Sequence, residues 1–126
     1  MTIAMTERRV LVNRTSGETL ASQVTLCDTF WLKLRGLMFR RSLDPGRAYV
    51  FVFDGESVAR TTIHMLFVFF PVAVLWLDAQ KRVIDTALAR PFRPCYVPRR
   101  AAACFIECAP GTLERVKVGD ELEWSL

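Results

Sequence analysis

His64 is the only histidine in this chain of 126 residues, and its side chain could serve catalysis most directly. An imidazole titrates near neutral pH, so it can act as an acid or a base, and it can also bind a metal ion. The sequence offers no second histidine and no Cys-x-x-Cys pair to complete a metal site. We therefore expect no metal and no cofactor. We interpret His64 as structural first, as a pocket-lining group second and as catalytic third.

Glu107 is the other catalytic candidate. It interrupts an apolar run, and strand alternation would turn it away from the face that carries Cys104, Ile106 and Cys108. There it either faces water or meets an arginine in a partly buried pair. Acid-base chemistry by His64 and Glu107 would require the two side chains to converge in a cleft, within hydrogen-bond reach directly or through one water.

Arginine side chains supply the candidates for anion binding. Arg35 and Arg40 flank a Gly-Leu-Met segment at near-helical spacing, where they could form a paired fork or could be exposed helix charges. Arg93 lies in a segment with three prolines, which is typical of a surface loop rather than a helix. Because loops carry function disproportionately, we predict Arg93, Arg35 and His64 as ligand-binding residues.

The charge balance limits the classes of partner. The chain has 17 basic and 13 acidic residues, for a net charge of +4, and its arginines occur as scattered pairs between acids. Nucleic-acid binding through an Arg-rich surface is therefore not favoured. The sequence also contains no Gly-rich phosphate loop and no G-x-S-x-G nucleophile motif. Whether the protein is an enzyme stays open on these observations.

Length and composition favour one folded domain. With 52% hydrophobic and 24% charged residues, a chain of this length can bury a core without metals or disulfides. We expect residues 1–9 to form an N-terminal tail and residues 10–126 to form a single domain.

No stretch of the sequence is expected to enter a membrane or to direct export. The opening residues lack the apolar run of a signal peptide, and the most apolar window, 65–77, is shorter than the ~20 residues of a membrane helix. Four cysteines are therefore expected to be free thiols in a reducing compartment: Cys27, Cys95, Cys104 and Cys108. These observations predict a soluble, cytoplasmic protein.

The elements that must position these side chains follow from apolar periodicity. Apolar residues recur at helical spacing over Thr29–Arg40, which predicts one main amphipathic helix. Runs rich in β-branched and aromatic residues predict strands at 10–13, 20–26, 48–53, 58–66, 72–77, 82–88, 101–108 and 121–124. A single helical turn is expected over Pro110–Arg115. The predicted fold class is α+β and β-rich, with a curved, mostly antiparallel, small barrel-like sheet and one main helix.

Five segments carry a shared pattern: FWLKLRGLMFRRSL (30–43), TIHMLFVFFPVAVLWLD (62–78), PFR (91–93), FIECAPGT (105–112) and VGDEL (118–122). Together they resemble the domain-of-unknown-function 192 (DUF192) family, in the family's order, over roughly residues 10–124. The resemblance implies a fold before a function, because the family is named for lacking an assigned activity. Where the family usually has an Arg and an Asp around its Phe-Pro pair, this chain has Phe69 and Ala73. We expect Phe69 to cover apolar surface near Ala73.

Three functional hypotheses remain open. The first is a non-catalytic module that binds a small ligand or a protein at one end of the sheet, rimmed by the Pro91–Pro98 loop and His64. The second is a small enzyme that acts on an anionic substrate, with His64 as acid or base and Arg93 or Arg35 holding the substrate. The third is nucleic-acid binding, which would need a continuous arginine face and a steep salt dependence.

Overall fold

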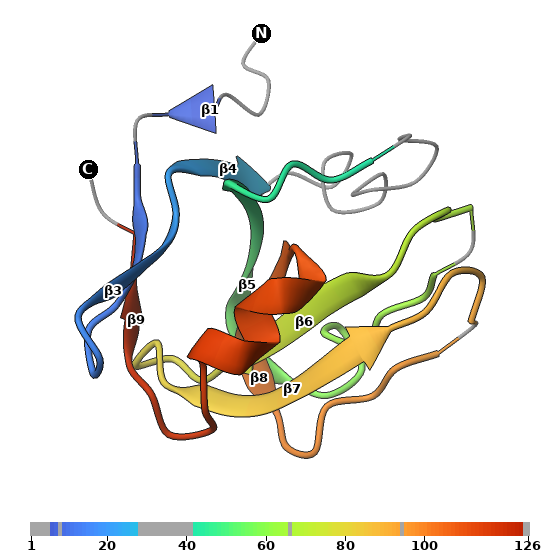
Figure 1. The fold of residues 1–126 in the computed structure, drawn as a ribbon. Helices are drawn as coiled ribbons and strands as arrows, with labels where there is room; N and C mark the ends of the chain where they lie inside the picture. The colour runs from blue at the N-terminus through green and yellow to red at the C-terminus, as the bar shows by residue number, and fades with distance from the viewer. Residues whose placement is uncertain (1–5, 8, 28–41, 66, 94, 125–126) are drawn as a thin grey trace, which may run out of the picture.

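The computed structural model describes residues 6–7, 9–27, 42–65, 67–93 and 95–124, and two β-sheets dominate these residues (Figure 1). The β-rich, mostly antiparallel fold class is confirmed. The described strands form two open sheets and no closed barrel, so the barrel-like closure is not confirmed. The predicted helix over Thr29–Arg40, and with it Arg35 and Arg40, lies outside the described residues.

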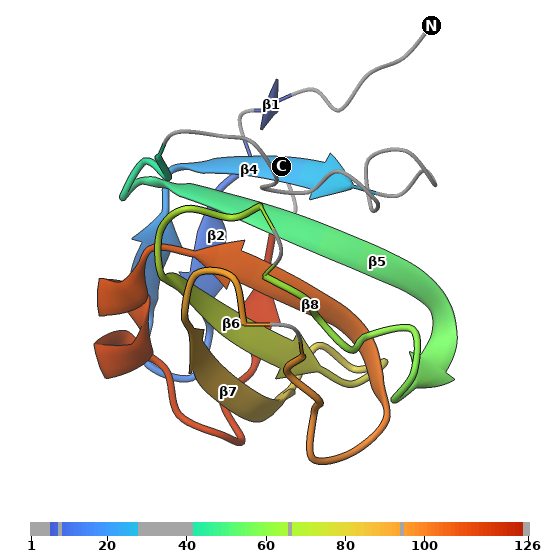
Figure 2. The same cartoon turned by 90° about the vertical axis from the view of Figure 1, so that its right-hand side faces the viewer.

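The larger sheet has six strands in the order β1-β4-β5-β8-β6-β7. Their bounds are β1 Thr6–Glu7, β4 Gln23–Cys27, β5 Arg47–Ser57, β8 Ala102–Cys108, β6 Val72–Leu77 and β7 Val83–Ala89. All neighbours pair antiparallel except β4 and β5, which run parallel and lie side by side in Figure 2. The β6 sequence VAVLWL is buried along its whole length, as its continuous apolar run predicts.

The smaller sheet joins segments from both ends of the chain. Strand β2, Leu11–Asn13, pairs with β3, Glu18–Ala21, and with β9, Leu122–Glu123. A 3-10 helix, η1, spans Pro110–Arg115 and confirms the expected helical turn after β8. Pro110 suits the first position of such a helix because the amide that it lacks would have no partner within the helix.

The apolar core lies on both faces of the larger sheet, because successive residues of a strand point to opposite sides. The first cluster faces β2, β3 and η1, and it contains Leu11, Leu20, Ala73, Leu75, Ile106 and Leu122 among others. The second cluster lies on the other face, and it includes Tyr49, Phe51, Val74, Trp76 and Phe105 from the strands and Ile63, Met65 and Val68 from the loop after β5. The loop after β5 therefore closes one side of the core.

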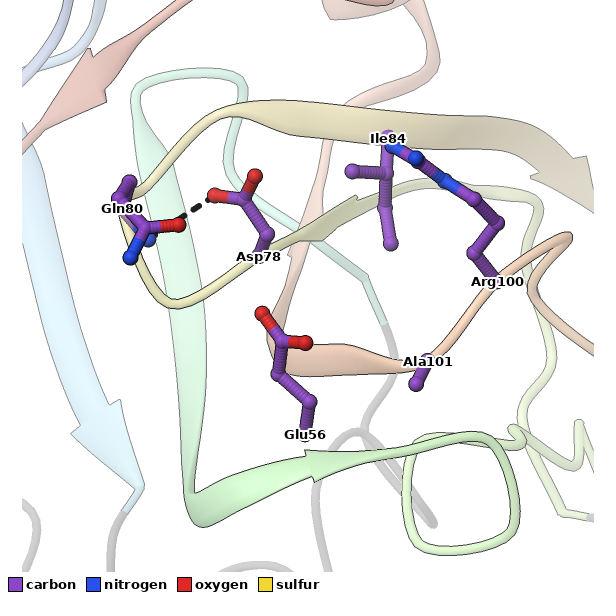
Figure 3. Close-up of a pocket in the computed structure, with 6 residues that line it drawn as sticks. All are labelled: Glu56, Asp78, Gln80, Ile84, Arg100 and Ala101. Atoms are coloured by element: carbon purple, nitrogen blue, oxygen red, sulfur yellow. Dashed lines mark hydrogen bonds between the residues drawn. The ribbon is translucent and has the colours of Figure 1, made fainter.

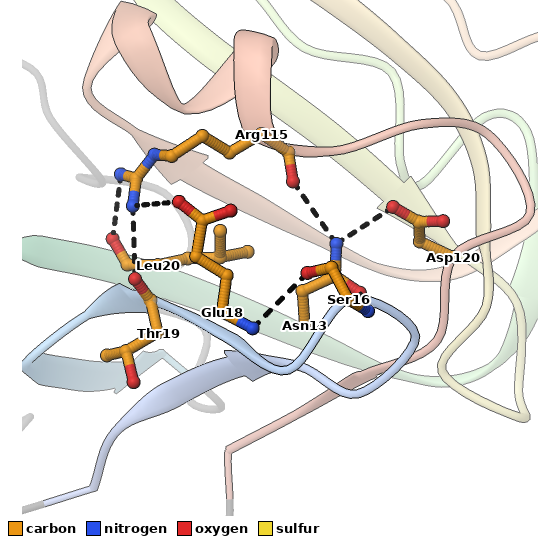
Figure 4. Close-up of polar contacts among 7 residues, drawn as sticks. All are labelled: Asn13, Ser16, Glu18, Thr19, Leu20, Arg115 and Asp120. Atoms are coloured by element: carbon orange, nitrogen blue, oxygen red, sulfur yellow. Dashed lines mark hydrogen bonds and ion pairs between the residues drawn. The ribbon is translucent and has the colours of Figure 1, made fainter.

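A polar junction, formed by Asn13, Glu18, Arg115 and Asp120, ties the smaller sheet to the rest of the chain (Figure 4). Asn13 is fully buried, and its Nδ2 donates hydrogen bonds to the carboxylate of Asp120 at 2.8 Å and to the carbonyl of Arg115 at 3.2 Å. Its Oδ1 accepts two amide hydrogen bonds from the β2–β3 turn. The Arg115 guanidinium donates to two carbonyls of β3 and lies 3.5 Å from the Glu18 carboxylate. Both polar ends of the buried amide are thus satisfied.

The expected strand over 58–66 is wrong. Among the residues of this stretch that the structure describes, only Ile63 forms a β-bridge, and that bridge is isolated, whereas β5 runs on to Ser57. The hydroxyls of Thr61 and Thr62 donate to carbonyls three and four positions back, and such local bonds compete with a strand ladder. The indole Nε1 of Trp76 then donates a buried 2.7 Å hydrogen bond to the Thr61 carbonyl, which fixes the loop on the sheet.

Candidate binding surface

The loops that follow β5 and β7 pair with each other above the second core cluster (Figure 1, green and orange). Ile63 and Tyr96 form the isolated antiparallel bridge. Met65 donates a backbone hydrogen bond to Arg93 and accepts one from Phe92, each at 2.8 Å. Ile63 and Met65 are buried, so packing and backbone hydrogen bonds together hold the loop pair in place.

Three phenylalanine rings project from this loop pair into solvent. Phe67, Phe69 and Phe92 are 47%, 52% and 48% exposed, and the rings of Phe69 and Phe92 meet edge to face with centroids 5.3 Å apart. These three residues, with Arg90 and Arg93, are called the aromatic end below. Six of the eight large apolar side chains that are exposed in the described part of the chain lie on the two loops or at the end of β7: Val58, Phe67, Phe69, Leu88, Phe92 and Val97. The contact between Phe69 and Phe92 makes part of this apolar surface contiguous, and contiguous exposed apolar surface is typical of interaction sites.

The expectation that Phe69 covers Ala73 is wrong. Ala73 is fully buried in the first core cluster, on the side of the sheet that faces η1, whereas Phe69 is exposed and contacts Phe92. The two positions that replace the family's charged pair therefore lie in different surroundings.

The backbone beneath two of the rings adopts an unfavourable conformation. Phe67 and Phe92 have φ angles of 61° and 64°, and among the described non-glycine residues only Lys81 shares this left-handed region. A side chain in that region crowds the following carbonyl, at a cost of about 1 kcal/mol or more for each residue. Hydrogen bonds to the carbonyl of Met65 from the amides of Phe92 and Val68 hold the conformation. Strain that the surroundings enforce is frequently linked to function.

The two loops are basic and contain no acid. No Asp or Glu occurs between Glu56 and Asp78, or between Asp85 and Glu107. The same two stretches contain five arginines and the only histidine: Arg60, Arg90, Arg93, Arg99, Arg100 and His64. Arg90 and Arg93 lie closest in sequence to Phe92 and to the backbone hydrogen bonds that join the two loops.

Two of the predicted ligand-binding residues, His64 and Arg93, lie on this loop pair. Both side chains are exposed, and His64 belongs to the loop rather than to a strand. Because the neighbours of His64, Ile63 and Met65, point into the core, the imidazole points outward. The third predicted residue, Arg35, lies outside the described residues.

Glu107 lies elsewhere, inside the larger sheet. It stands between Tyr49 of β5 and Val74 of β6, on the face opposite to Ile106, and only 6% of its surface is exposed. Burial raises the pKa of the Glu107 carboxyl to about 8. Within the ranges that the structure describes, no hydrogen bond or ion pair reaches this carboxyl, and none joins it to the outward-facing His64.

The cysteines and the metal-binding groups offer little reactive chemistry. None of the four cysteines forms a disulfide bond, and Cys95 is the exposed one among them. Burial raises the pKa of the Cys104 and Cys108 thiols to about 12, so neither forms a thiolate near neutral pH. No group of three or more His, Cys, Asp or Glu side chains among the described residues could hold a metal ion. The described residues also contain no helix long and apolar enough to cross a membrane.

The family model of DUF192, described as "Uncharacterized ACR", matches residues 11–124. The chain belongs to the DUF192 family. A UPF0127 protein of Thermococcus kodakarensis is 36% identical over 118 residues, which cover 92% of this chain and 73% of the relative. A UPF0127 protein of Pyrococcus abyssi is 34% identical over 117 residues, which cover 91% of this chain and 97% of the relative.

Solved structures share the fold of this DUF192 protein. A protein of Sinorhizobium meliloti, provisionally described as a transcription regulator, superimposes with a TM-score of 0.83 at 25% identity over 98% of this chain and 97% of its own. A protein of unknown function from Novosphingobium aromaticivorans gives a TM-score of 0.78 at 24% identity over 92% of this chain and 84% of its own. These likenesses show the architecture and assign no activity.

Sequence reasoning missed Phe67, Phe69 and Phe92 as candidate functional residues. Phe67 and Phe69 follow the stretch predicted as a strand over 58–66, Phe92 lies in the predicted surface loop, and nothing local marks which of these rings stay outside. One signal was available in the sequence: no Asp or Glu occurs on either side of Pro71 or around Phe92. A core strand needs no such bias in charge, so this bias sets the two segments apart from core strands.

Proposed function

We propose that this DUF192 protein is a non-catalytic binding module that docks an acidic protein segment at the aromatic end. The observation that carries the proposal is the placement of half-exposed phenylalanines, two of them on left-handed backbone, on two loops whose sequences contain arginines and no acid. Rings that stay exposed and strain the backbone contribute little to folding. Their burial against a partner would recover the apolar free energy that folding leaves unused.

The apolar part of the surface can supply useful affinity. Burying a phenylalanine side chain fully is worth about 1.5–3 kcal/mol, and each ring of the aromatic end has roughly half of that still available. Three rings together would contribute on the order of 3 kcal/mol before the costs of association. Rigid aromatic side chains also lose little conformational entropy on binding, which is why they are common at the centre of interfaces.

The charged part of the surface selects the kind of partner. Arg90 and Arg93 are exposed beside the rings, and exposed charges at the rim of an interface act mainly on the rate of association and on specificity. A segment with Asp or Glu flanking an apolar side chain matches both properties of this surface. A basic segment would be repelled.

The positions of His64 and Glu107, the two candidates for catalysis, favour a binding module over an enzyme. His64 points outward from the loop pair, whereas Glu107 is buried between two strands. An acid-base pair would need both groups at one reacting centre. His64 serves better as a further polar contact at the rim, beside Arg93.

Labelled peptides test the proposal by fluorescence polarisation. A peptide of alternating Asp and Leu should bind, and peptides with Lys in place of Asp, or Ser in place of Leu, should bind at least tenfold more weakly. The double substitution Phe69→Ala and Phe92→Ala should reduce binding of the Asp-Leu peptide at least tenfold. Val118→Ala is the matched control, because Val118 is 58% exposed outside the aromatic end. Equal binding of the Lys peptide, or no loss in the double variant, would refute the proposal.

A second candidate function is binding of single-stranded nucleic acid at the same surface. Exposed rings and arginines are the groups on which single strands stack and bind, and one structural neighbour is provisionally described as a transcription regulator. Oligo(dT) should then bind with an affinity that falls steeply as salt rises, and the phenylalanine variants should weaken it. Tighter binding of the Asp-Leu peptide than of oligo(dT) at physiological salt would identify a protein segment as the partner.

We place this activity in the cytoplasm. The support is that none of the four cysteines forms a disulfide bond, although Cys95 is exposed and an oxidising compartment would tend to modify it. Localisation of a tagged chain by fractionation tests the placement.

A further inference from the structure

A polar groove of about 400 Å³ lies between the turn after β6, the end of β5 and the segment that leads into β8 (Figure 3). It is lined by Glu56, Asp78, Gln80, Ile84, Arg100 and Ala101. None of these residues belongs to the aromatic end. The groove mixes charged side chains of both signs with the apolar wall of Ile84.

The two carboxylates of the groove are held in place by backbone amides. Glu56 Oε2 accepts a hydrogen bond from the amide of Ala79 at 2.9 Å. Asp78 Oδ1 accepts from the amides of Gln80 and Arg82, also at 2.9 Å each. Each carboxylate therefore keeps a second oxygen for another donor, and Figure 3 shows both groups beside the same space. Carboxylates that are already held in place lose less conformational entropy when they bind a cation.

Arg100 contributes a positive charge to the same groove without neutralising the carboxylates. Over the described ranges, no hydrogen bond or ion pair of the Arg100 guanidinium is found, so it lies beyond ion-pair distance from both Glu56 and Asp78. Opposite charges in one groove that do not meet leave room for a ligand that meets both. The Gln80 amide can add a donor or an acceptor beside them.

We propose that this groove binds an amino-acid-sized zwitterion, with its ammonium group at Glu56 and Asp78 and its carboxylate at Arg100. Two carboxylates suit an ammonium group, whose donors point in several directions, and a guanidinium suits a carboxylate. A divalent cation fits less well, because the described part of the chain contains no group of three or more His, Cys, Asp or Glu to hold one. This site goes beyond the docking of a protein segment at the aromatic end.

A series of ω-amino acids tests the site, because chain length varies the distance between the two charges. Glycine, γ-aminobutyrate and 6-aminohexanoate are titrated into uniformly ¹⁵N-labelled protein, with putrescine and glutarate as probes that carry only one kind of charge. We expect saturable shifts of the Ala79, Gln80 and Arg82 amide signals with one preferred length. Putrescine and glutarate should bind at least fivefold more weakly than the preferred zwitterion.

Conservative variants separate the site from a general charge effect. Arg100→Gln should abolish the preference for the zwitterion over putrescine, and Glu56→Gln, which keeps an acceptor for the Ala79 amide, should abolish the preference over glutarate. Arg99→Gln is the matched control, because the exposed neighbouring arginine does not line the groove and should leave binding unchanged. The proposal is overturned if no ω-amino acid shifts these amide signals at any concentration up to about 20 mM, which is at least about 50-fold above the protein concentration. It is equally overturned if Arg100→Gln and Arg99→Gln behave alike.

Discussion

At the polar junction, buried Asn13 uses both ends of its side-chain amide in four hydrogen bonds, whereas at the aromatic end three rings remain half exposed. The junction joins segments distant in sequence and leaves its central amide satisfied. The aromatic end occupies left-handed backbone at two of its phenylalanines and gains little burial in return. The difference indicates that the polar junction mainly stabilises the fold, whereas the aromatic end lowers the stability of the fold to some extent.

Replacing Asn13 by Ala should have the largest effect, because it removes the centre of the junction. Four hydrogen bonds are lost, at about 1 kcal/mol each, and the free energy of unfolding should fall by about 4 kcal/mol. Urea denaturation at pH 7 measures this change in the free energy of unfolding. Ser16→Ala is the control, because it removes one exposed hydrogen bond that the Ser16 hydroxyl accepts from the Glu18 amide, and it should cost less than about 1 kcal/mol. Equal stabilities of the two variants would break the comparison.

Glu107 and Asp120 extend the comparison to two carboxylates. Asp120 accepts from the Asn13 side chain and the Lys117 amide, whereas burial without a described partner raises the pKa of Glu107 to about 8. The folded-state pKa lies above the unfolded value of 4.5, so the unfolded chain ionises first. The protein should therefore lose stability as pH rises from about 4.5 to about 8.

The substitution Glu107→Gln isolates this contribution, because the amide is similar in shape and does not ionise. The variant should lack the decline between pH 5 and 8 and should be more stable than wild type at pH 9. Glu114→Gln, at an exposed position of η1, should keep the wild-type profile. Parallel profiles for all three proteins would show that Glu107 is solvated or paired.

Substitutions at Phe92 separate strain from contact. Phe92→Ala keeps a side chain on left-handed backbone and loses the contact with Phe69, whereas Phe92→Gly also relieves the strain. The Gly variant should be about 1 kcal/mol more stable than the Ala variant and within about 1 kcal/mol of wild type. Both should lose binding of the Asp-Leu peptide. A large destabilisation of both variants would assign the ring to folding instead.

The smallest expected effect comes from the ion pair between Lys81 and Glu123, whose charged atoms lie 2.7 Å apart on the surface. The hydrogen bond from Lys81 lowers the pKa of the Glu123 carboxyl, so the pair stabilises above the unfolded pKa and is lost as pH falls through the folded one. Glu123→Gln should cost about 0.5 kcal/mol in low salt and nothing measurable in 1 M NaCl. A salt-independent loss would point to packing rather than charge.

Much of the fold could be predicted from the sequence. Strands β6, β7 and β8 and the turn η1 follow from local signals, namely continuous apolar runs, a hairpin turn with Asp78 and a proline start at Pro110. The position of Glu107 opposite to Ile106 also follows from simple alternation. These features depend on neighbouring residues, so a single sequence carries them.

The candidate binding surface could be predicted only in part. The sequence indicates Arg93 as a loop residue and His64 as a rim residue, but the contact between Phe69 and Phe92 joins residues that are distant in sequence. The same is true of the left-handed backbone at Phe92, which a hydrogen bond to Met65 supports. Residue types alone cannot show which of several aromatic side chains a long-range pairing turns outward.

The pairing of β2 with β9 has a consequence for the speed of folding. Asn13 and Asp120 are 107 positions apart, so the contacts between them close nearly the whole chain into one loop. The entropy of closing a loop grows with its length, and folds rich in distant contacts reach the native state slowly. We therefore expect the larger sheet to assemble around β5, β8 and β6 first, and the two ends to meet last. During synthesis, Asn13 would wait for Asp120, which is added 107 positions later.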